Sequence, residues 1–366
     1  MKVGIYTFHK ETNYGAVLQA YATQYIIRSF GVETEIVNYY PREKEKRNSY
    51  IGKNDSLKSI IKNIYAVVNP MMWTKSKRFS EFHEMMSLSR RYETIDEIYQ
   101  NPPVYDVHLV GSDQVWNLER GFSKRAFFFL DFLKRDEKRI SYASSFGNAD
   151  ISSSTYPRLK DLLSKFSAIS VREDSGVKLI EKATGLHAEH VLDPTLLLTR
   201  AQWQELSSDN PVVSGDYILY YGFDKDDTCR QMINMLCTTL RMPIIAVSVS
   251  PTIPYKVDKL IQSAGPKEFV NLFLNANYVI TSSFHGVAFA LNFQKDFVVM
   301  KHGTRMSRME SLLDMVSLKN RIVSSVPEME TLLENEIHVD YSVSYEGLER
   351  NRRFSIDWLK TSLYKN

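Results

Sequence analysis

The chain has few cysteines, little net charge and no long apolar run, and each shortage argues against a class of protein. Its two cysteines, Cys229 and Cys237, are eight residues apart in a stretch with a helical pattern, roughly 12 Å along a helix and too far for a disulfide. We therefore expect a reducing compartment, the cytoplasm. A net charge of +3 over 366 residues gives no reason to expect a nucleic-acid partner. No run of about 18 apolar residues could span a membrane, and the opening residues MKVGIYTF predict a strand, not a signal peptide.

Sequence motifs for several kinds of chemistry are also missing. The histidines do not have metal-ligand spacing, and there is no D-x-D motif of a metal-dependent sugar-nucleotide enzyme. Neither a phosphate-binding P-loop, a three-glycine dinucleotide fingerprint nor the G-x-S-x-G of a serine hydrolase is present. We therefore expect no metal and no cofactor.

Strand and helix patterns alternate along the chain, which predicts an α/β protein with mainly parallel sheets. The first series has strands at residues 2–7, 34–39, 104–110, 140–146, 168–171 and 190–192, with a helix at 16–30 closed by Gly31. The second has strands at 217–222, 244–248, 278–281 and 297–299, with helices at 227–241, 266–275 and 286–293. We predict an N-terminal domain at 1–200 with a helical or irregular insertion at 42–100, a second domain at 205–325, and a helical tail at 326–366.

Ligands of parallel sheets bind beyond the carboxyl ends of the strands, so polar residues directly after a predicted strand are the candidates for a site. After the first strand come Asn13, Tyr14 and Gly15 in HKETNYGAVLQAY, although Asn13 could equally be a plain helix N-cap. VGSDQVWN places Asp113 and Gln114 after another strand, where the alternative is again an N-cap at Ser112 or Asp113 and where Trp116 reads as core. SYASSFGN adds the weaker candidate Ser144.

Cations and a histidine follow three further strands. Arg172 in SVREDSG could bind a carboxylate or phosphate, or it could be a surface residue paired with Glu173 or Asp174. His285 in SSFHG lies where a strand gives way to a helix, and the alternative is a structural histidine. Just downstream, KHGTRMSR supplies a basic loop with Lys301, His302 and Arg305. Together these groups predict an anion site.

Six motifs in this order, NYGAVLQAYA, VGSDQVWN, YASSFG, SVREDSG, VLDPTLLL and SSFHGVAFALNF, resemble the polysaccharide pyruvyl transferase family over roughly residues 1–320. The resemblance implies two Rossmann-like domains in a glycosyltransferase-B-like arrangement, with a C-terminal helix that packs back. It also implies transfer of pyruvyl from phosphoenolpyruvate to two hydroxyls of one sugar, in a polysaccharide or a lipid-linked precursor, giving a cyclic ketal.

The resemblance also suggests roles for the candidate residues. His285 and Asp113 would be catalytic, and the donor would be bound by Arg172, Lys301, His302, Arg305 and Ser283, the last standing where several relatives have arginine. The acceptor would be bound by Asn13, Tyr14, Gly15, Gln114 and Ser144, with no metal. Two alternatives stay open: a nucleotide-sugar glycosyltransferase of the same fold, and a non-catalytic carbohydrate-binding protein in which Arg172 and His285 are exposed or structurally paired.

Residues 42–91 hold many Lys and Arg side chains beside Met71, Met72 and Trp73. One interpretation is peripheral contact with the inner face of a membrane, in which Lys75, Lys77 and Arg78 meet anionic headgroups. The other is an amphipathic helix that covers the N-terminal sheet and whose charges are merely solvated.

Overall fold

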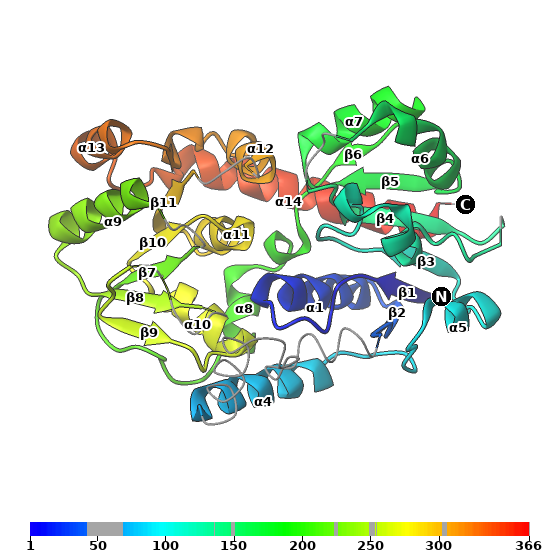
Figure 1. Ribbon diagram of the computed structural model, residues 1–366, viewed down its shortest axis with the longest axis horizontal. Coiled ribbons are helices and arrows are strands. Elements are labelled where there is room, and N and C mark those ends of the chain that lie inside the picture. The colour runs from blue at the N-terminus through cyan, green and yellow to red at the C-terminus, as the bar shows by residue number, and fades with distance from the viewer. Residues whose placement is uncertain are drawn as a thin grey trace, which may run out of the picture. The chain divides into compact units, whose positions relative to one another are not determined.

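The computed structural model describes residues 1–41, 69–134, 136–147, 151–222, 226–248, 253, 255–301 and 306–365. The chain divides into two compact units, Met1–Pro194 with Phe354–Asn366 and Thr195–Arg353. Each unit has a six-stranded parallel sheet flanked by helices (Figure 1). The predicted α/β class with two Rossmann-like domains is therefore confirmed.

The sheet of the first unit has the order β2-β1-β3-β4-β5-β6, and every neighbouring pair is parallel. Its strands are β1 Lys2–Tyr6, β2 Glu33–Ile36, β3 Val107–Val110, β4 Arg139–Ser144, β5 Ala168–Val171 and β6 Glu189–His190. Its helices are α1 Tyr14–Ser29, α4 Pro70–Glu84, α5 Ile95–Gln100, α6 Tyr156–Leu163 and α7 Asp174–Thr184. The strands β1, β3 and β4 are almost wholly buried, as expected for a parallel sheet covered on both faces.

The sheet of the second unit has the order β12-β11-β10-β7-β8-β9 and is also parallel throughout. Its strands are β7 Ile218–Tyr221, β8 Ile244–Val247, β9 Lys259–Ile261, β10 Tyr278–Thr281, β11 Asp296–Met300 and β12 Ile322–Val323. Its helices are α8 Arg200–Leu206, α9 Asp227–Leu240, α10 Pro266–Asn275, α11 Phe284–Asn292, α12 Ser307–Met315 and α13 Val326–Asn335. The pattern predicted neither β9 nor β12, which have three and two residues.

The last helix, α14 Tyr341–Tyr364, belongs to both units, since the first unit takes it up from Phe354 onward. In the first unit Ser355 Oγ accepts a hydrogen bond from the backbone N–H of Leu192 at 2.9 Å, and the ring of Trp358 lies 6.3 Å from that of Tyr142. The predicted return of the C-terminal helix to the N-terminal unit is therefore confirmed. No helix in the described ranges is both long and apolar enough to cross a membrane.

The insertion predicted at 42–100 is described only from residue 69 onward, and there it forms α4 and α5. Helix α4 packs on α1, with the ring of Phe79 5.4 Å from Tyr14 and that of Phe82 5.4 Å from Tyr21. Met72 and Lys75 are buried on this face. A buried Met72 fits the amphipathic-helix interpretation, whereas the solvent- or headgroup-facing Lys75 of both interpretations is wrong. The reason is their spacing: positions 72, 75, 79 and 82 follow the helical repeat and form the packed face.

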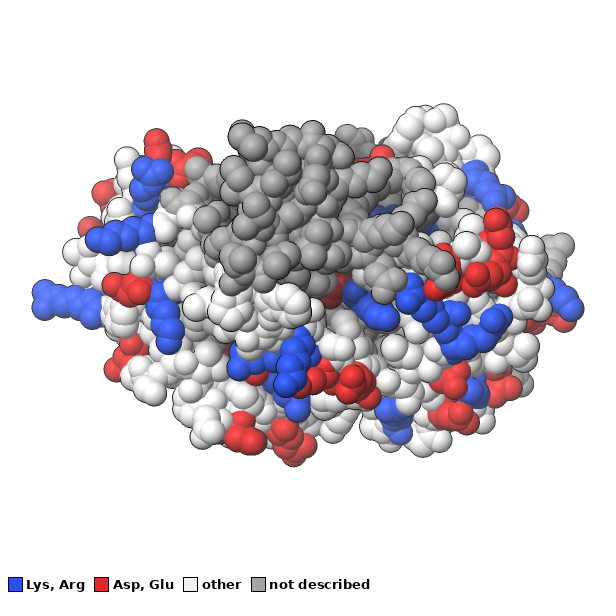
Figure 2. Space-filling view, turned by 60° about the horizontal axis from the view of Figure 1, so that its bottom comes forward, with Lys and Arg blue, Asp and Glu red and all other residues white. Residues whose placement is uncertain are grey.

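The charged residues elsewhere on the surface are mixed. Figure 2 shows Lys and Arg side chains interspersed with Asp and Glu side chains over the described part of one face. In α4, Trp73 and Met71 remain exposed. Residues 42–68, which carry much of the basic run, lie outside the described residues.

Candidate functional site

Each sheet has one point where the strand order reverses, and ligands of open parallel sheets bind beside such points at the carboxyl ends of the strands. In the first unit the reversal lies between β1 and β3. The loops that follow these strands hold Asn13 and Asp113. In the second unit it lies between β7 and β10, and His285 follows β10. The strand order therefore places three of the predicted stretches at the two positions where a site is expected.

The loop after β1 ends in a capped helix. Asn13 is the N-cap of α1, and its side chain accepts a hydrogen bond from the N–H of Ala16 at 3.2 Å. Tyr14 and Gly15 are buried, and the ammonium group of Lys75 lies 5.4 Å from the centre of the Tyr14 ring. Burial lowers the pKa of Lys75 to about 7. The N-cap alternative for Asn13 is thus what the structure has, and Lys75 is a buried basic group that the sequence analysis had placed on the surface.

Asp113 follows β3 with a left-handed backbone, φ 75°, which is uncommon for a residue other than glycine. No α-helix begins there, so the N-cap alternative for this residue is wrong. Its backbone pairs with Ser144 in an isolated bridge, and its carboxylate Oδ1 accepts hydrogen bonds from the N–H of Gln114 at 2.8 Å and from Arg172 at 3.1 Å. The Asp113 side chain is 17% exposed. The turn therefore holds a partly accessible carboxylate at the edge of the sheet.

The neighbouring candidates after β3 and β4 differ in accessibility. Gln114 is half-buried and accepts a hydrogen bond from Asn117 Nδ2 at 3.0 Å. Ser144 is wholly buried, and its hydroxyl donates to the carbonyl of Gly111 at 3.1 Å. Trp116 is in the core, as predicted.

Arg172 is buried between two carboxylates. One guanidinium nitrogen lies 2.9 Å from Asp193 Oδ2 and the other 3.1 Å from Asp113 Oδ1, and the Arg172 side chain is 0% exposed. Burial by itself would lower the pKa of Arg172, but the charges of Asp113 and Asp193 outweigh it and raise that pKa. The alternative of a surface arginine is wrong, because Arg172 is buried. The charge of the buried Glu173 also helps to raise the pKa of Arg172, and its carboxylate accepts the N–H of Phe146 at 2.9 Å.

Asp193 was not assigned a role from the sequence, although it lies in the motif VLDPTLLL. Its side chain is 0% exposed, and Oδ2 accepts both the Arg172 guanidinium and the hydroxyl of Ser112, the latter at 2.7 Å. A carboxylate followed by proline within an apolar stretch was the available signal. Its partner lies 21 positions earlier, so only the folded chain identifies the pair.

His285 is the second residue of α11 and is 8% exposed, as is Ser283. The hydroxyl of Thr281 donates to the carbonyl of Tyr221 at 2.5 Å and accepts the N–H of Ser283 at 3.0 Å. A Cβ atom added to Gly286 would lie 2.1 Å from this hydroxyl oxygen. Glycine therefore lets α11 begin against the end of β10, with His285 in its first turn.

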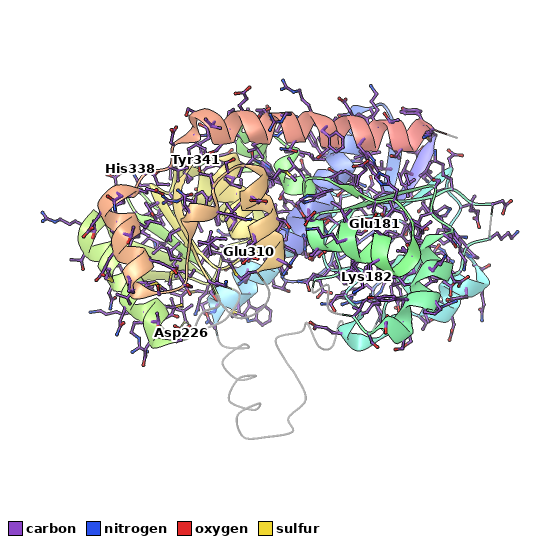
Figure 3. The ribbon with its side chains drawn as sticks, turned by 90° about the horizontal axis from the view of Figure 1, so that it is seen from above. Glu181, Lys182, Asp226, Glu310, His338 and Tyr341 are labelled. Carbon is purple, nitrogen blue, oxygen red and sulfur yellow. The ribbon has the colours of Figure 1, made fainter. Side chains whose placement is uncertain are left out.

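The basic loop after β11 is described only in part. Lys301 has a side chain 46% exposed and pairs at 3.8 Å with Glu310. Glu310 lies on α12 (Figure 3). His302 and Arg305 lie outside the described residues. Among the residues that the structure describes, no group of three or more His, Cys, Asp or Glu side chains is arranged to hold a metal ion.

A polar cavity of about 310 Å³ in the second unit lies away from these strand ends. It is lined by α8, the segment after it and the last turns of α10, and includes Arg200, Gln204, Asn271 and Asn275. Because α10 ends just before β10 begins, this cavity is at the amino end of that strand. It is therefore not at the edge where His285 lies.

Comparison with family models decides the relationship of this chain to known proteins. The model of the polysaccharide pyruvyl transferases matches residues 13–304. The chain belongs to the polysaccharide pyruvyl transferase family. The match begins at Asn13 and includes Asp113, Arg172, Asp193 and His285. Comparison with curated proteins found no match.

Solved structures with a similar fold include two UDP-N-acetylglucosamine 2-epimerases. The enzyme from Rickettsia bellii has a TM-score of 0.53 at 10% identity, with 99% of this chain and 97% of that chain covered. The enzyme from Methanocaldococcus jannaschii has a TM-score of 0.52 at 13% identity, with 97% and 99% covered. At this identity the similarity establishes the fold alone: two Rossmann-like domains, as in the glycosyltransferase-B class.

Proposed function

We propose that this polysaccharide pyruvyl transferase takes its pyruvyl group from phosphoenolpyruvate and forms a cyclic ketal on two hydroxyls of one sugar. The acceptor would be a sugar in a polysaccharide or in a lipid-linked precursor. The observation that carries the proposal is the family match over residues 13–304, because it includes Asn13, Asp113 and His285, which follow strands at the two strand-order reversals.

The proposed reaction needs an acid and a base. A proton added to C3 of the enol ether leaves an oxocarbenium-like centre at C2, which a sugar hydroxyl attacks. Phosphate departs with its bonding electrons, and the second hydroxyl closes the ring. Each hydroxyl gives up a proton as its bond to C2 forms. Positioned acid–base groups typically contribute about 10²- to 10⁴-fold to such steps.

Two residues suit these tasks by their position. Asp113 is a partly exposed carboxylate at the edge of the first sheet, and we assign it to accept a hydroxyl proton. His285 lies in the first turn of α11, where the positive end of the helix dipole favours an anion, and we assign it to acid–base work or to phosphate contact. Lys301, Arg305 and His302 remain our candidates for the charges of the donor. The candidates for binding the acceptor remain Asn13, Tyr14, Gly15, Gln114 and Ser144. Those with buried side chains would contact the acceptor through their backbone groups.

The decisive experiment combines the purified chain, phosphoenolpyruvate labelled with ¹³C at C2 and candidate oligosaccharide acceptors. We expect a product that carries the label in a ketal carbon and an equal amount of released phosphate, measured by mass spectrometry and NMR. Omission of the acceptor is the control for simple hydrolysis. Absence of a labelled ketal with every acceptor of a broad panel would count against the proposal.

Nucleotide-sugar transfer is the second candidate, favoured by the fold shared with UDP-N-acetylglucosamine 2-epimerases. Calorimetric titration distinguishes the two, because phosphoenolpyruvate should bind and UDP compounds should not. If the protein were a non-catalytic carbohydrate-binding protein, Arg172 would be exposed or structurally paired. Its ion pairs with Asp113 and Asp193 agree with structural pairing. Labelled ketal formation would exclude that alternative.

We further propose that the reaction needs no metal, because cationic side chains can compensate the carboxylate and phosphate of the donor. Dialysis against EDTA should then leave turnover unchanged. The proposed place of the reaction is the cytoplasm, with peripheral contact to the inner membrane face through the exposed Trp73 and Met71 and the basic residues around them.

A further inference from the structure

We propose that Asp193 and Ser112 are positioning residues, which act through Arg172 to hold the Asp113 carboxylate at the carboxyl edge of the first sheet. The assignment rests on the proposed function, because it takes Asp113 as the group that accepts a hydroxyl proton. It gives Arg172 an indirect role in place of the direct donor contact expected from the resemblance.

The contacts form one continuous chain of hydrogen bonds. Ser112 Oγ donates to Asp193 Oδ2 at 2.7 Å, and the same oxygen accepts from Arg172 at 2.9 Å. The other terminal nitrogen of Arg172 then donates to Asp113 Oδ1 at 3.1 Å. The side chains of Arg172 and Asp193 are 0% exposed, whereas that of Asp113 is 17% exposed. Solvent and substrate can therefore reach the Asp113 end of the chain, and the rest is support behind it.

The backbone around Asp113 is fixed independently of its side chain. The carbonyl of Ser112 accepts the hydroxyl of Thr7 at 2.9 Å, and the carbonyl of Asp113 accepts the N–H of Ser145 at 3.0 Å. The left-handed φ of 75° sets the direction in which the Asp113 side chain leaves the sheet. The rotation of the Asp113 carboxylate is set by the hydrogen bonds that it accepts from Arg172 and from the N–H of Gln114.

The charges of the cluster argue against Arg172 as the direct counter-ion of the donor. One guanidinium faces the carboxylates of Asp113 and Asp193, so these three groups together carry one excess negative charge when ionised. A donor with a carboxylate and a phosphate would be repelled there unless it displaced one of the carboxylates. A planar guanidinium can bridge two carboxylates in fixed directions, a task that a lysine ammonium does not perform.

Steady-state kinetics with phosphoenolpyruvate and acceptor test the assignment. Asp193→Asn should lower kcat about 10- to 100-fold, as expected for a lost charge-assisted hydrogen bond, and leave KM for phosphoenolpyruvate within about threefold. Arg172→Lys should likewise lower kcat and leave KM for phosphoenolpyruvate nearly unchanged. In an Asp113→Asn background, Asp193→Asn should change kcat by less than about twofold, because its effect passes through Asp113.

A milder variant guards against loss of folding. Ser112→Ala removes one hydrogen bond to Asp193 and should lower kcat about 3- to 10-fold with KM unchanged. Its matched control is Ser141→Ala, since Ser141 is also wholly buried, on β4 of the same sheet, and its hydroxyl donates to the carbonyl of Ser170 and accepts the N–H of Ser170. Ser141→Ala should leave kcat within about threefold of the wild type. Circular dichroism confirms the fold of each variant.

Four results would overturn the assignment. Unchanged kcat in Asp193→Asn is the first, and a raised KM for phosphoenolpyruvate with normal kcat in Arg172→Lys is the second. The third is a full additional loss from Asp193→Asn in the Asp113→Asn background, and the fourth is an equal loss in Ser141→Ala and Ser112→Ala. A wild-type chain without phosphoenolpyruvate turnover would instead refute the proposed function, and the assignment with it.

Discussion

Replacing Gly286 by alanine tests how closely α11 must approach β10. The new Cβ would lie 2.1 Å from Thr281 Oγ1 and 2.8 Å from Thr281 Cβ, whereas ordinary contacts begin at 3.4 Å. The helix or the strand end must therefore move by about 1 Å. We expect Gly286→Ala to destabilise the second unit, because overpacking of this kind typically costs about 1–3 kcal/mol.

Two further terms adjust the size of this effect. Movement of Thr281 weakens its hydrogen bonds to the carbonyl of Tyr221 and from the N–H of Ser283, at about 1 kcal/mol each. Alanine within a helix is more stabilising than glycine by about 0.5–1 kcal/mol, and this difference offsets part of the lost stability. The net expectation is a destabilisation of about 2–4 kcal/mol, together with a fall in turnover of about 10²-fold from displacement of His285.

Urea unfolding of the second unit, followed by far-UV circular dichroism, measures the effect. Gly347→Ala in α14 is the matched control, because its nearest contact would be 3.6 Å and the change should be neutral or stabilising. Removing the obstacle with Thr281→Ala should restore part of the stability lost in Gly286→Ala. If Gly286→Ala proved as stable as Gly347→Ala, the argument that Thr281 requires glycine at this position would be refuted.

Three other predictions follow from the structure. His285→Gln keeps a polar group but removes the titratable proton, so turnover should fall about 10²-fold or more, and near-normal kcat would exclude an acid–base role. Burial and then the charge of Arg139 lower the pKa of His108 to about 4, so its contribution to the free energy of unfolding is complete above pH 6.5 and is lost as the pH falls towards 4. The loss is up to ~3 kcal/mol. The urea midpoint should therefore fall less steeply between pH 7.5 and 4.5 for His108→Phe than for the wild type. The chain should sediment with anionic but not neutral vesicles at low salt, and Trp73→Ala with Lys77→Glu should weaken this; Lys75→Glu would instead disrupt the packed face of α4, so it is no test of membrane contact.

The class of the fold and the positions of most elements follow from patterns that are local in the sequence. Strands such as Tyr278–Thr281 and Ala168–Val171 are short buried runs between turn signals, and their predicted bounds equal the observed ones. The helix Pro266–Asn275 was predicted equally well, since it begins at a proline and repeats apolar residues at helical spacing. Such signals are local, so the sequence carries them without knowledge of the partners.

Which groups meet in the folded chain does not follow from local patterns. Sequence spacing does not reveal that β1 and β3 are neighbours across the strand-order reversal, because the order of strands in a sheet depends on long-range packing. Arg172 was expected to face a ligand, and only the fold brings Asp193 and Asp113 to it. A lysine in a basic segment is expected on the surface, yet Lys75 lies on the packed face of α4 against Tyr14. A charged side chain is drawn into the interior by contacts distant in the chain, and these exist only after folding.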